Sequence, residues 1–357
     1  MKKIDCILIT GGHGFIGQNL VASLVTDFPI VVVDNLLKQV HPNLGKLHID
    51  SRIDSYVGGI AEKKLWSALL LKYNPVIVIH LAAETSTGLS AIEMDTHTSA
   101  NVDGMAVMLS AFVRHDCVPE KFLLASSRAV YGEGYWLDTD NKMVPGDRRR
   151  FKDLVAGDWN PRENDLEGPF LVTPTANNWK SSSKKPTSVY GLTKAFQEDL
   201  AILWAETNGV SLSILRFQNV YGPGQTPSNS YTGILGLFIR QAMQKIQLEV
   251  YESGGIVRDF VYISDVVKAI NVSLSRKDSL SVADVGTGRS LTLLELANKI
   301  SMHYQINAPL IVQTFRMGDV RSAFSEQSGW LDGWRPEISI EEGLSPTISY
   351  VENFFES

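Results

Sequence analysis

Two residues one helical turn apart, Tyr190 and Lys194 in the segment SVYGLTK, could exchange a proton near neutral pH. Residues four positions apart lie on the same face of an α-helix. A phenol titrates near pH ~10, and a nearby positive charge favours its ionised form. We therefore expect Lys194 to lower the pKa of Tyr190. The alternative is that Tyr190 packs and Lys194 lies in water, because Tyr-x-x-x-Lys also occurs by chance.

A glycine-rich turn near the N-terminus favours the catalytic interpretation. The segment IDCILITGGHGFIGQNLVASLV predicts a buried strand, a turn and an amphipathic helix, with Gly11, Gly14 and Gly17 in the turn. Glycines at this spacing allow a tight turn and let the backbone approach a pyrophosphate. The helix N-terminus then presents free N–H groups to phosphate. The segment therefore predicts a dinucleotide site.

Asp34 ends the second predicted strand, in FPIVVVDNL. A carboxylate there can accept hydrogen bonds from an adenosine ribose and would repel a 2′-phosphate, which favours NAD over NADP. The alternative is that Asp34 only caps the following turn. With the glycines upstream, cofactor binding is the favoured interpretation.

Predicted strands and helices alternate through the first half of the chain. After Asp34 come the helix WSALLLKY, the strand PVIVIHLAA, the helix NVDGMAVMLSAFVRH and the strand KFLLASS. The helix containing Tyr190 and the strand SLSILRF follow. This alternation predicts an α/β fold of the Rossmann type, a doubly wound parallel sheet with helices on both faces.

Composition excludes several classes of partner. The chain has 357 residues, 44% hydrophobic and 20% charged, with a net charge of -6. It can form one large domain or two fused ones. No long basic run is present, so we expect no nucleic-acid partner. The short basic segment 147–150 is interpreted first as a solvated loop and second as a phosphate-contacting loop.

The two cysteines, Cys6 and Cys117, indicate neither a metal site nor a disulfide framework. Cys6 lies in an apolar run and is expected in the core. No stretch is long and apolar enough to span a bilayer, and the N-terminus enters a strand at once, unlike a signal peptide. The sequence therefore predicts a cytoplasmic protein with no membrane partner.

Ordered motifs along nearly the whole chain resemble the extended short-chain dehydrogenase/reductases that modify nucleotide sugars. They are TGGHGFIG, HLAAE, NVDG, ASSRAVYG, SVYGLTK, RFQNVYGPGQ, RDFVYISDV, VGTGRSLTLLELA and GDVR. The resemblance implies NAD as cofactor and a nucleotide sugar as substrate. It also implies a homodimer, whose expected contact is a four-helix bundle of the NVDGMAVMLSAFVRH helix and the Tyr190 helix.

The resemblance also implies residue roles. Ser127, Tyr190 and Lys194 are the catalytic residues. Asn101 is expected to support cofactor and helix geometry, although a plain helix asparagine is an alternative, and an ion pair with Asp319 is the alternative for Arg321. Besides Tyr190, Lys194 and Asn101, the expected cofactor contacts are Gly11, Gly14, Phe15, Ile16, Gly17, Asp34, Asn35, Gly59, Ile60, Leu81, Ala82, Ala83, Phe217 and Val220. The expected substrate contacts are Glu84, Ser127, Arg128, Asn219, Arg258 and Arg321.

The residues after Ser127 narrow the reaction. Dehydratases of this family carry an Asp-Glu pair there, whereas this chain has Arg128-Ala129. Cys117 is badly placed for a carbanion epimerase. The segments LASSRAVYGEG and VPGDRRRFKDLVAGDWNPRE resemble the bacterial dTDP-L-rhamnose 4-epimerase group, without the cysteine pairs of its insertion. We expect 4-epimerisation of a dTDP-linked 6-deoxyhexose. The alternatives are a 4-ketoreductase, a related activity on a UDP-, GDP- or CDP-sugar, and a non-catalytic dinucleotide sensor.

Two domains are expected, with the substrate in the cleft between them. Residues 1–220 would form the NAD-binding Rossmann domain, with an insertion at about 135–187. Residues 221–357 would form a smaller α/β domain that binds the nucleotide sugar, with some chain crossing back. The insertion is too long for an ordinary connection. It could be a lid, a sugar-contacting loop, an oligomer contact or a partly disordered excursion.

Overall fold

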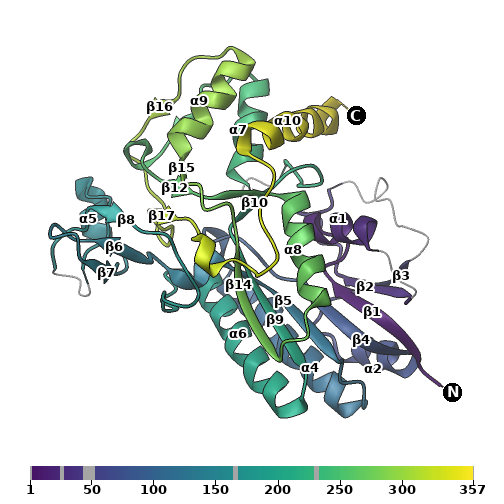
Figure 1. The fold of residues 1–357 in the computed structure, drawn as a ribbon. Helices are drawn as coiled ribbons and strands as arrows, with labels where there is room; N and C mark the ends of the chain where they lie inside the picture. The colour runs from purple at the N-terminus through teal and green to yellow at the C-terminus, as the bar shows by residue number, and fades with distance from the viewer. Residues whose placement is uncertain (1, 25–27, 43–52, 164–167, 229–232, 357) are drawn as a thin grey trace.

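A seven-stranded parallel sheet forms the larger part of the protein (Figure 1). The computed structural model describes residues 2–24, 28–42, 53–163, 168–228 and 233–356. The strand order is β14-β9-β5-β4-β1-β2-β3, and every pair is parallel. This confirms the predicted Rossmann-type fold. The strands are β1 (Ile4–Thr10), β2 (Ile30–Asp34), β3 (Ile53–Val57), β4 (Tyr73–His80), β5 (Lys121–Ser127), β9 (Ser211–Phe217) and β14 (Leu280–Val285).

Helices cover both faces of the sheet, because alternate strand residues point to opposite sides. Leu8 of β1 packs in one apolar cluster with side chains of α2 (Lys63–Lys72), α4 (Gly104–Arg114) and α6 (Val189–Asn208). Its neighbours Ile7 and Ile9 pack in another, with α1 (Phe15–Ser23) and α8 (Ile263–Ser275). Cys6 is fully buried in the first cluster, as predicted.

The smaller region has its own apolar core. Three helices and three small sheets form it above the carboxyl ends of the large sheet (Figure 1). The chain also returns to the large sheet here, because α8 and β14 both follow residue 221. The elements are α7 (Ile234–Met243), α9 (Leu293–Tyr304), α10 (Ile340–Glu356), β10 (Asn219–Tyr221), β11 (Glu249–Val250), β12 (Val257–Arg258), β13 (Phe260–Tyr262), β15 (Leu291–Thr292), β16 (Leu310–Ile311) and β17 (Ser322–Ala323).

The insertion forms a small lobe at one side of the molecule (Figure 1). Its described residues build a three-stranded sheet of β6 (Tyr135–Leu137), β7 (Met143–Pro145) and β8 (Thr173–Pro174), with the short helix α5 (Phe151–Ala156). Residues 164–167 of the predicted insertion lie outside the described residues. A compact core of Trp136, Val144 and Leu171 holds the lobe together.

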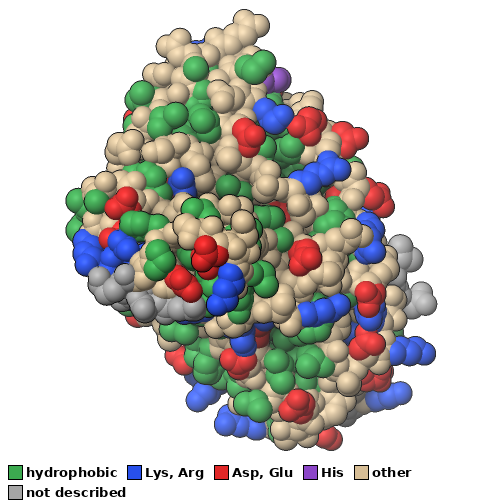
Figure 2. Space-filling model, turned by 60° about the vertical axis from the view of Figure 1, so that its left-hand side comes forward, with side chains coloured by type: hydrophobic (Ala, Val, Ile, Leu, Met, Phe, Trp, Pro, Cys, Tyr) green, Lys and Arg blue, Asp and Glu red, His purple; other side chains and the backbone are tan. Residues whose placement is uncertain are grey.

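Charges of both signs are interspersed over the face that carries the insertion (Figure 2). In the part of the chain that the structure describes, no helix is both long and apolar enough to cross a bilayer.

Candidate active site

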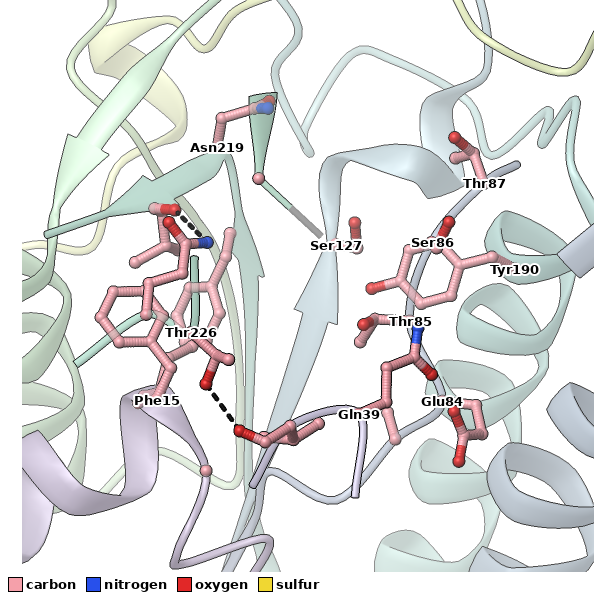
Figure 3. Close-up of a pocket in the computed structure, with 18 of the residues that line it drawn as sticks. Phe15, Gln39, Glu84, Thr85, Ser86, Thr87, Ser127, Tyr190, Asn219 and Thr226 are labelled. Atoms are coloured by element: carbon pink, nitrogen blue, oxygen red, sulfur yellow. Dashed lines mark hydrogen bonds between the residues drawn. The ribbon is translucent and has the colours of Figure 1, made fainter. Parts of the chain in front are cut away.

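A cavity of about 1070 Å³ opens where the carboxyl ends of the large sheet meet the smaller region. The turn after β1 and the ends of β2, β4 and β5 line one side, and residues of α7, β11 and β13 line the other. Ligands of doubly wound folds bind at this edge of the sheet, because loops from neighbouring strands diverge there. The close-up in Figure 3 shows side chains from both regions facing this cavity.

The glycine turn is shaped for close approach of a ligand. Gly11 has φ +69°, and a Cβ there would lie 2.8 Å from the Ala82 backbone nitrogen. A Cβ on Gly17 would lie 2.5 Å from the carbonyl oxygens of Gly11 and Gly12. Gly14 precedes α1 without any side-chain cap, so the helix N-terminus can offer N–H groups to a phosphate. The turn therefore fits a dinucleotide pyrophosphate.

Asp34 is held as a carboxylate at the end of β2. It accepts hydrogen bonds from the backbone N–H groups of His13 at 3.0 Å and Leu36 at 2.9 Å, and His41 Nε2 lies 3.8 Å from Oδ1. Burial opposes ionisation, but these contacts outweigh it, so the pKa of Asp34 lies below its usual value. The negative charge needed to repel a 2′-phosphate is thus present at the cavity wall.

Ser127 and Tyr190 meet at the cavity (Figure 3). Ser127 ends β5, and Tyr190 lies in the first turn of α6, whose N-cap Ser188 accepts a hydrogen bond from Gly191 N at 3.0 Å. Burial raises the pKa of Tyr190, whereas a hydrogen bond with Ser127 and the charge of Arg128 act to lower it. The pair is therefore placed to share a proton with a bound hydroxyl group.

Lys194 lies one turn after Tyr190 in α6, and its ammonium group contacts β5. Its Nζ donates to the carbonyl oxygen of Ala125 at 2.9 Å, and its side chain is buried outside the cavity lining. Burial lowers the pKa of Lys194 to about 8, against the opposing charge of Glu198. The charge of Arg128 acts to lower the pKa of Tyr190 in this structure.

Asn101 does not line the cavity but holds residues that do. It lies in a π-helical turn (Ser99–Asp103), and its Oδ1 accepts from Glu84 N at 2.8 Å. Its Nδ2 donates to Glu84 O at 2.9 Å and to Thr193 Oγ1 at 3.0 Å. Asn101 therefore ties the loop after β4 to α6, while Glu84 itself lines the cavity. Burial raises the pKa of the Glu84 carboxyl.

Three arginines line the cavity beyond the catalytic residues: Arg128, Arg258 and Arg316. Arg128 directly follows Ser127, and Arg258 ends β12 with its Nη1 donating to the carbonyl oxygen of Val257 at 2.8 Å. Neither comes within 4.0 Å of a carboxylate of the residues that the structure describes. Burial, and then repulsion by Arg128, lower the pKa of Arg258 to about 9. A cavity with two guanidinium groups that lack a carboxylate partner suits a dianionic ligand.

Arg321 points away from the cavity. Its Nη1 donates to the Glu252 backbone oxygen at 2.8 Å and lies 3.3 Å from Glu252 Oε2. The alternative predicted pair with Asp319 is also absent among the described contacts, because Asp319 Oδ1 accepts from Thr87 at 2.7 Å.

All but three of the predicted site residues line one cavity. The exceptions are Asn101, Lys194 and Arg321. The residues brought together are Gly11, Gly14, Phe15, Ile16, Gly17, Asp34, Asn35, Gly59, Ile60, Leu81, Ala82, Ala83, Glu84, Ser127, Arg128, Tyr190, Phe217, Asn219, Val220 and Arg258.

Several cavity residues carried no recognisable signal in the sequence. Tyr251 and Arg316 line the cavity together, with the guanidinium 5.5 Å from the ring centroid. Thr226 donates to Val40 O at 2.6 Å, joining the loop after β2 to the loop after β10 (Figure 3). These residues come from loops and short strands, so no helical or strand periodicity marked them.

No cluster of metal-ligating side chains occurs within the described ranges. Cys6 and Cys117 are both unpaired and buried.

Comparison with known proteins identifies the family. A sequence model of the NAD dependent epimerase/dehydratase family matches residues 7–149 and 167–286, which is more than half of the chain. The chain therefore belongs to this family of extended short-chain dehydrogenase/reductases, and it is an NAD-dependent epimerase. The residues between the two matched ranges, 150–166, belong to the insertion.

Individual relatives agree with this assignment. The chain is 41% identical to a dTDP-L-rhamnose 4-epimerase of Burkholderia thailandensis over 97% of its own length and 94% of the relative's. A UDP-glucose 4-epimerase of Thermotoga maritima, solved with UDP-glucose, is similar with a TM-score of 0.77 and 26% identity, covering 99% and 100% of the two chains. MoeE5, solved with UDP-glucuronic acid and NAD, has a TM-score of 0.73 and 26% identity, covering 98% and 99%.

Proposed function

We propose that this protein is an NAD-dependent nucleotide-sugar 4-epimerase acting on a dTDP-linked 6-deoxyhexose. The observation that carries the proposal is that Ser127 and Tyr190 line one cavity together with the glycine turn and with the arginines Arg128 and Arg258. The relative with dTDP-L-rhamnose 4-epimerase activity supports the sugar and the nucleotide.

The cofactor site is formed by the glycine turn and Asp34. The N-terminus of α1 would hold the pyrophosphate, and the Asp34 carboxylate at the cavity wall would accept hydrogen bonds from the adenosine ribose. NAD, when bound, supplies a reversible hydride acceptor for the sugar C4. Lys194 stabilises the catalytic face of α6 from its position on Ala125 O, and Asn101 holds α6 against the loop after β4.

Tyr190 and Ser127 act on the 4-hydroxyl group of the sugar. The Tyr190 phenolate removes the hydroxyl proton when C4 is oxidised and returns it when C4 is reduced. The Ser127 hydroxyl donates a hydrogen bond to the same oxygen. This oxygen gains negative character as its proton leaves and loses it as the proton returns. Burial raises the pKa of Tyr190, and the hydrogen bond with Ser127 and the charge of Arg128 oppose this rise.

The diphosphate anchors the substrate while the sugar turns. Arg258, Arg128 and Asn219 offer charge-assisted and neutral hydrogen bonds at the cavity wall. A 4-keto sugar held only by its diphosphate can present its opposite face before C4 is reduced again. Inversion at C4 then requires no external reductant.

Dehydration is disfavoured by the residues beside Ser127. The next two positions are Arg128 and Ala129, and neither side chain is a carboxylic acid that could eliminate water. This is the reason to prefer epimerisation over the dehydratase activity of other family members.

Residues 1–220 would then serve mainly as the cofactor domain and residues 221–357 mainly as the substrate domain. Because α8 and β14 return to the large sheet, residues 221–357 are divided between the smaller region and the Rossmann-type region. A cytoplasmic location suits two unpaired, buried cysteines.

A homodimer through α4 and α6 is part of this proposal. Leu192, Phe196 and Leu203 of α6 are 60%, 44% and 65% exposed, and Val113 of α4 is 49% exposed. Apolar side chains along one helix are suited to a helix-bundle contact. Light scattering at micromolar concentration should give a dimer, and Leu203→Glu should give a monomer. A monomeric wild type would contradict this contact.

The activity is tested by incubating the purified protein with dTDP-, UDP-, GDP- and CDP-linked sugars without added reductant. NMR should show interconversion of C4 epimers, fastest for a dTDP-linked 6-deoxyhexose. Turnover only with added NADH would indicate a ketoreductase instead, and loss of water would indicate a dehydratase.

A further inference from the structure

A buried cluster of four charged residues lies next to the cavity but does not line it. We name Glu133, Arg149, Glu252 and Arg321 the charge cluster; all four lie outside the cavity lining. The side chains of Glu133, Arg149 and Glu252 are at most 3% exposed, and that of Arg321 is 13% exposed. They come from the segment after β5, the insertion, the loop after β11 and the segment before β17.

Arg149 is the centre of this cluster. Its Nε donates to Glu133 Oε1 at 3.0 Å, and its Nη1 donates to Glu252 Oε2 at 2.6 Å. Its Nη1 also donates to Trp159 O at 3.0 Å, and its Nη2 donates to Asp319 O at 2.6 Å. The sequence interpretation of segment 147–150 as a solvated loop is therefore wrong for Arg149, which is buried.

Of the two glutamates, Glu133 relies more than Glu252 on Arg149 as its cationic partner. Glu252 is also paired with Arg321, whereas Arg149 is the only cation within ion-pair distance of Glu133 in the described structure. The other Glu133 oxygen accepts from the backbone N–H of Arg321 at 2.9 Å. Burial raises the pKa of Glu133, and Arg149 opposes this most strongly.

These acids interact electrostatically with the Arg321 guanidinium of the cluster and also with the cavity arginines. Glu133 acts electrostatically on both Arg128 and Arg258, and Glu252 acts on Arg258. A buried carboxylate that loses its partner must find another cation or accept a proton. Without Arg149, Glu133 would compete with the ligand for a cavity guanidinium.

We propose that Arg149 is a positioning residue that occupies Glu133 and Glu252 and thereby leaves Arg128 and Arg258 available to the diphosphate of the substrate. The inference rests on the proposed nucleotide-sugar function and gives the insertion a role in substrate binding. Arg149 also holds the main chain at Asp319, whose side chain bonds Thr87 at the cavity wall. The insertion therefore acts on the cavity from outside it.

The test is the affinity of the full-length protein for dTDP, measured by calorimetry. For Arg149→Met we expect the dissociation constant to rise about 10- to 100-fold, as for loss of one hydrogen bond to a charged group. NAD binding should be unchanged, and KM for the sugar nucleotide should rise more than kcat falls. Adding Glu133→Gln to Arg149→Met should restore most of the affinity, because the competing charge is removed.

Two further variants separate charge from packing. Arg149→Lys keeps the positive charge but cannot reach all four acceptors, so its dTDP affinity should fall between those of Arg149→Met and the wild type. The matched control is Arg162→Met, which removes an arginine of the same insertion that pairs with Asp153 at 3.1 Å and should leave dTDP affinity unchanged.

Several results would overturn the inference. The first is a dTDP affinity of Arg149→Met equal to that of the wild type. The second is a dTDP affinity that Glu133→Gln does not restore when it is added to Arg149→Met. The third is a loss of dTDP affinity in Arg149→Lys as large as in Arg149→Met. If Arg149→Met does not fold, the Arg149→Lys result still decides between charge and packing. A wild type that binds no nucleoside diphosphate would instead refute the proposed function, and this inference with it.

Discussion

The two ends of the cavity are built in different ways. At the cofactor end, Asp34 is held by contacts within the first 41 residues, from the backbone N–H groups of His13 and Leu36 and from the His41 side chain. At the sugar end, side chains from distant segments converge, and Arg149 alone joins partners 16, 103 and 170 positions away. The difference indicates that the cofactor end is a fixed scaffold, whereas the substrate end depends on long-range charge placement.

The largest expected effect separates chemistry from cofactor binding. Tyr190→Phe removes the only proton-exchanging group proposed for the 4-hydroxyl, so kcat should fall by about 10²–10⁴. Bound NAD should stay, because the glycine turn and Asp34 are untouched. Steady-state kinetics and cofactor content by absorbance are the measurements. Turnover within a few-fold of the wild type would remove Tyr190 from the mechanism.

A smaller effect is expected at the cofactor end. Asp34→Asn removes the negative charge at the end of β2, so the preference for NAD over NADP should narrow by roughly tenfold. The affinity for dTDP should not change, since Asp34 lies on β2 of the large sheet and Arg258 on β12 of the smaller region. Titration of both cofactors checks this. An unaltered NAD preference would show that steric fit, and not the Asp34 carboxylate, excludes the 2′-phosphate.

The residues of the cofactor end could be predicted from the sequence, whereas those that organise the sugar end could not. Gly11, Gly17 and Asp34 could be predicted because the residues that define their roles lie within one strand-turn-helix-strand unit. Arg149 could not, because its burial depends on Glu252 and on the main chain at Asp319, which only the fold brings near.

Lys194 and Arg128 illustrate the same point within the active site. Helical spacing correctly placed Lys194 one turn after Tyr190, but spacing could not show that its Nζ turns to Ala125 O. The role of Arg128 beside Tyr190 depends on how the segment after β5 packs on α6, where a Cβ on Gly191 would lie 2.5 Å from Ala129 O. Periodicity predicts a helix face, but tertiary packing decides which charge acts on it.

The smallest expected effect tests that electrostatic role. Arg128 lowers the pKa of Tyr190, so Arg128→Met should raise it. Because the base must be ionised, the rising limb of the kcat/KM profile should move to higher pH, with activity partly recovered in alkaline buffer. Arg128→Lys should move the limb less. An unshifted profile would show that Arg128 acts only on substrate binding.

The central claim is that the hydrogen removed from C4 returns to C4 on the opposite face. The most direct measurement uses a dTDP-linked 6-deoxyhexose carrying deuterium at C4, incubated with the purified protein and no added reductant. We predict that NMR will show both C4 epimers with deuterium still at C4. Loss of the label to solvent, or a requirement for added NADH, would contradict the proposed reaction.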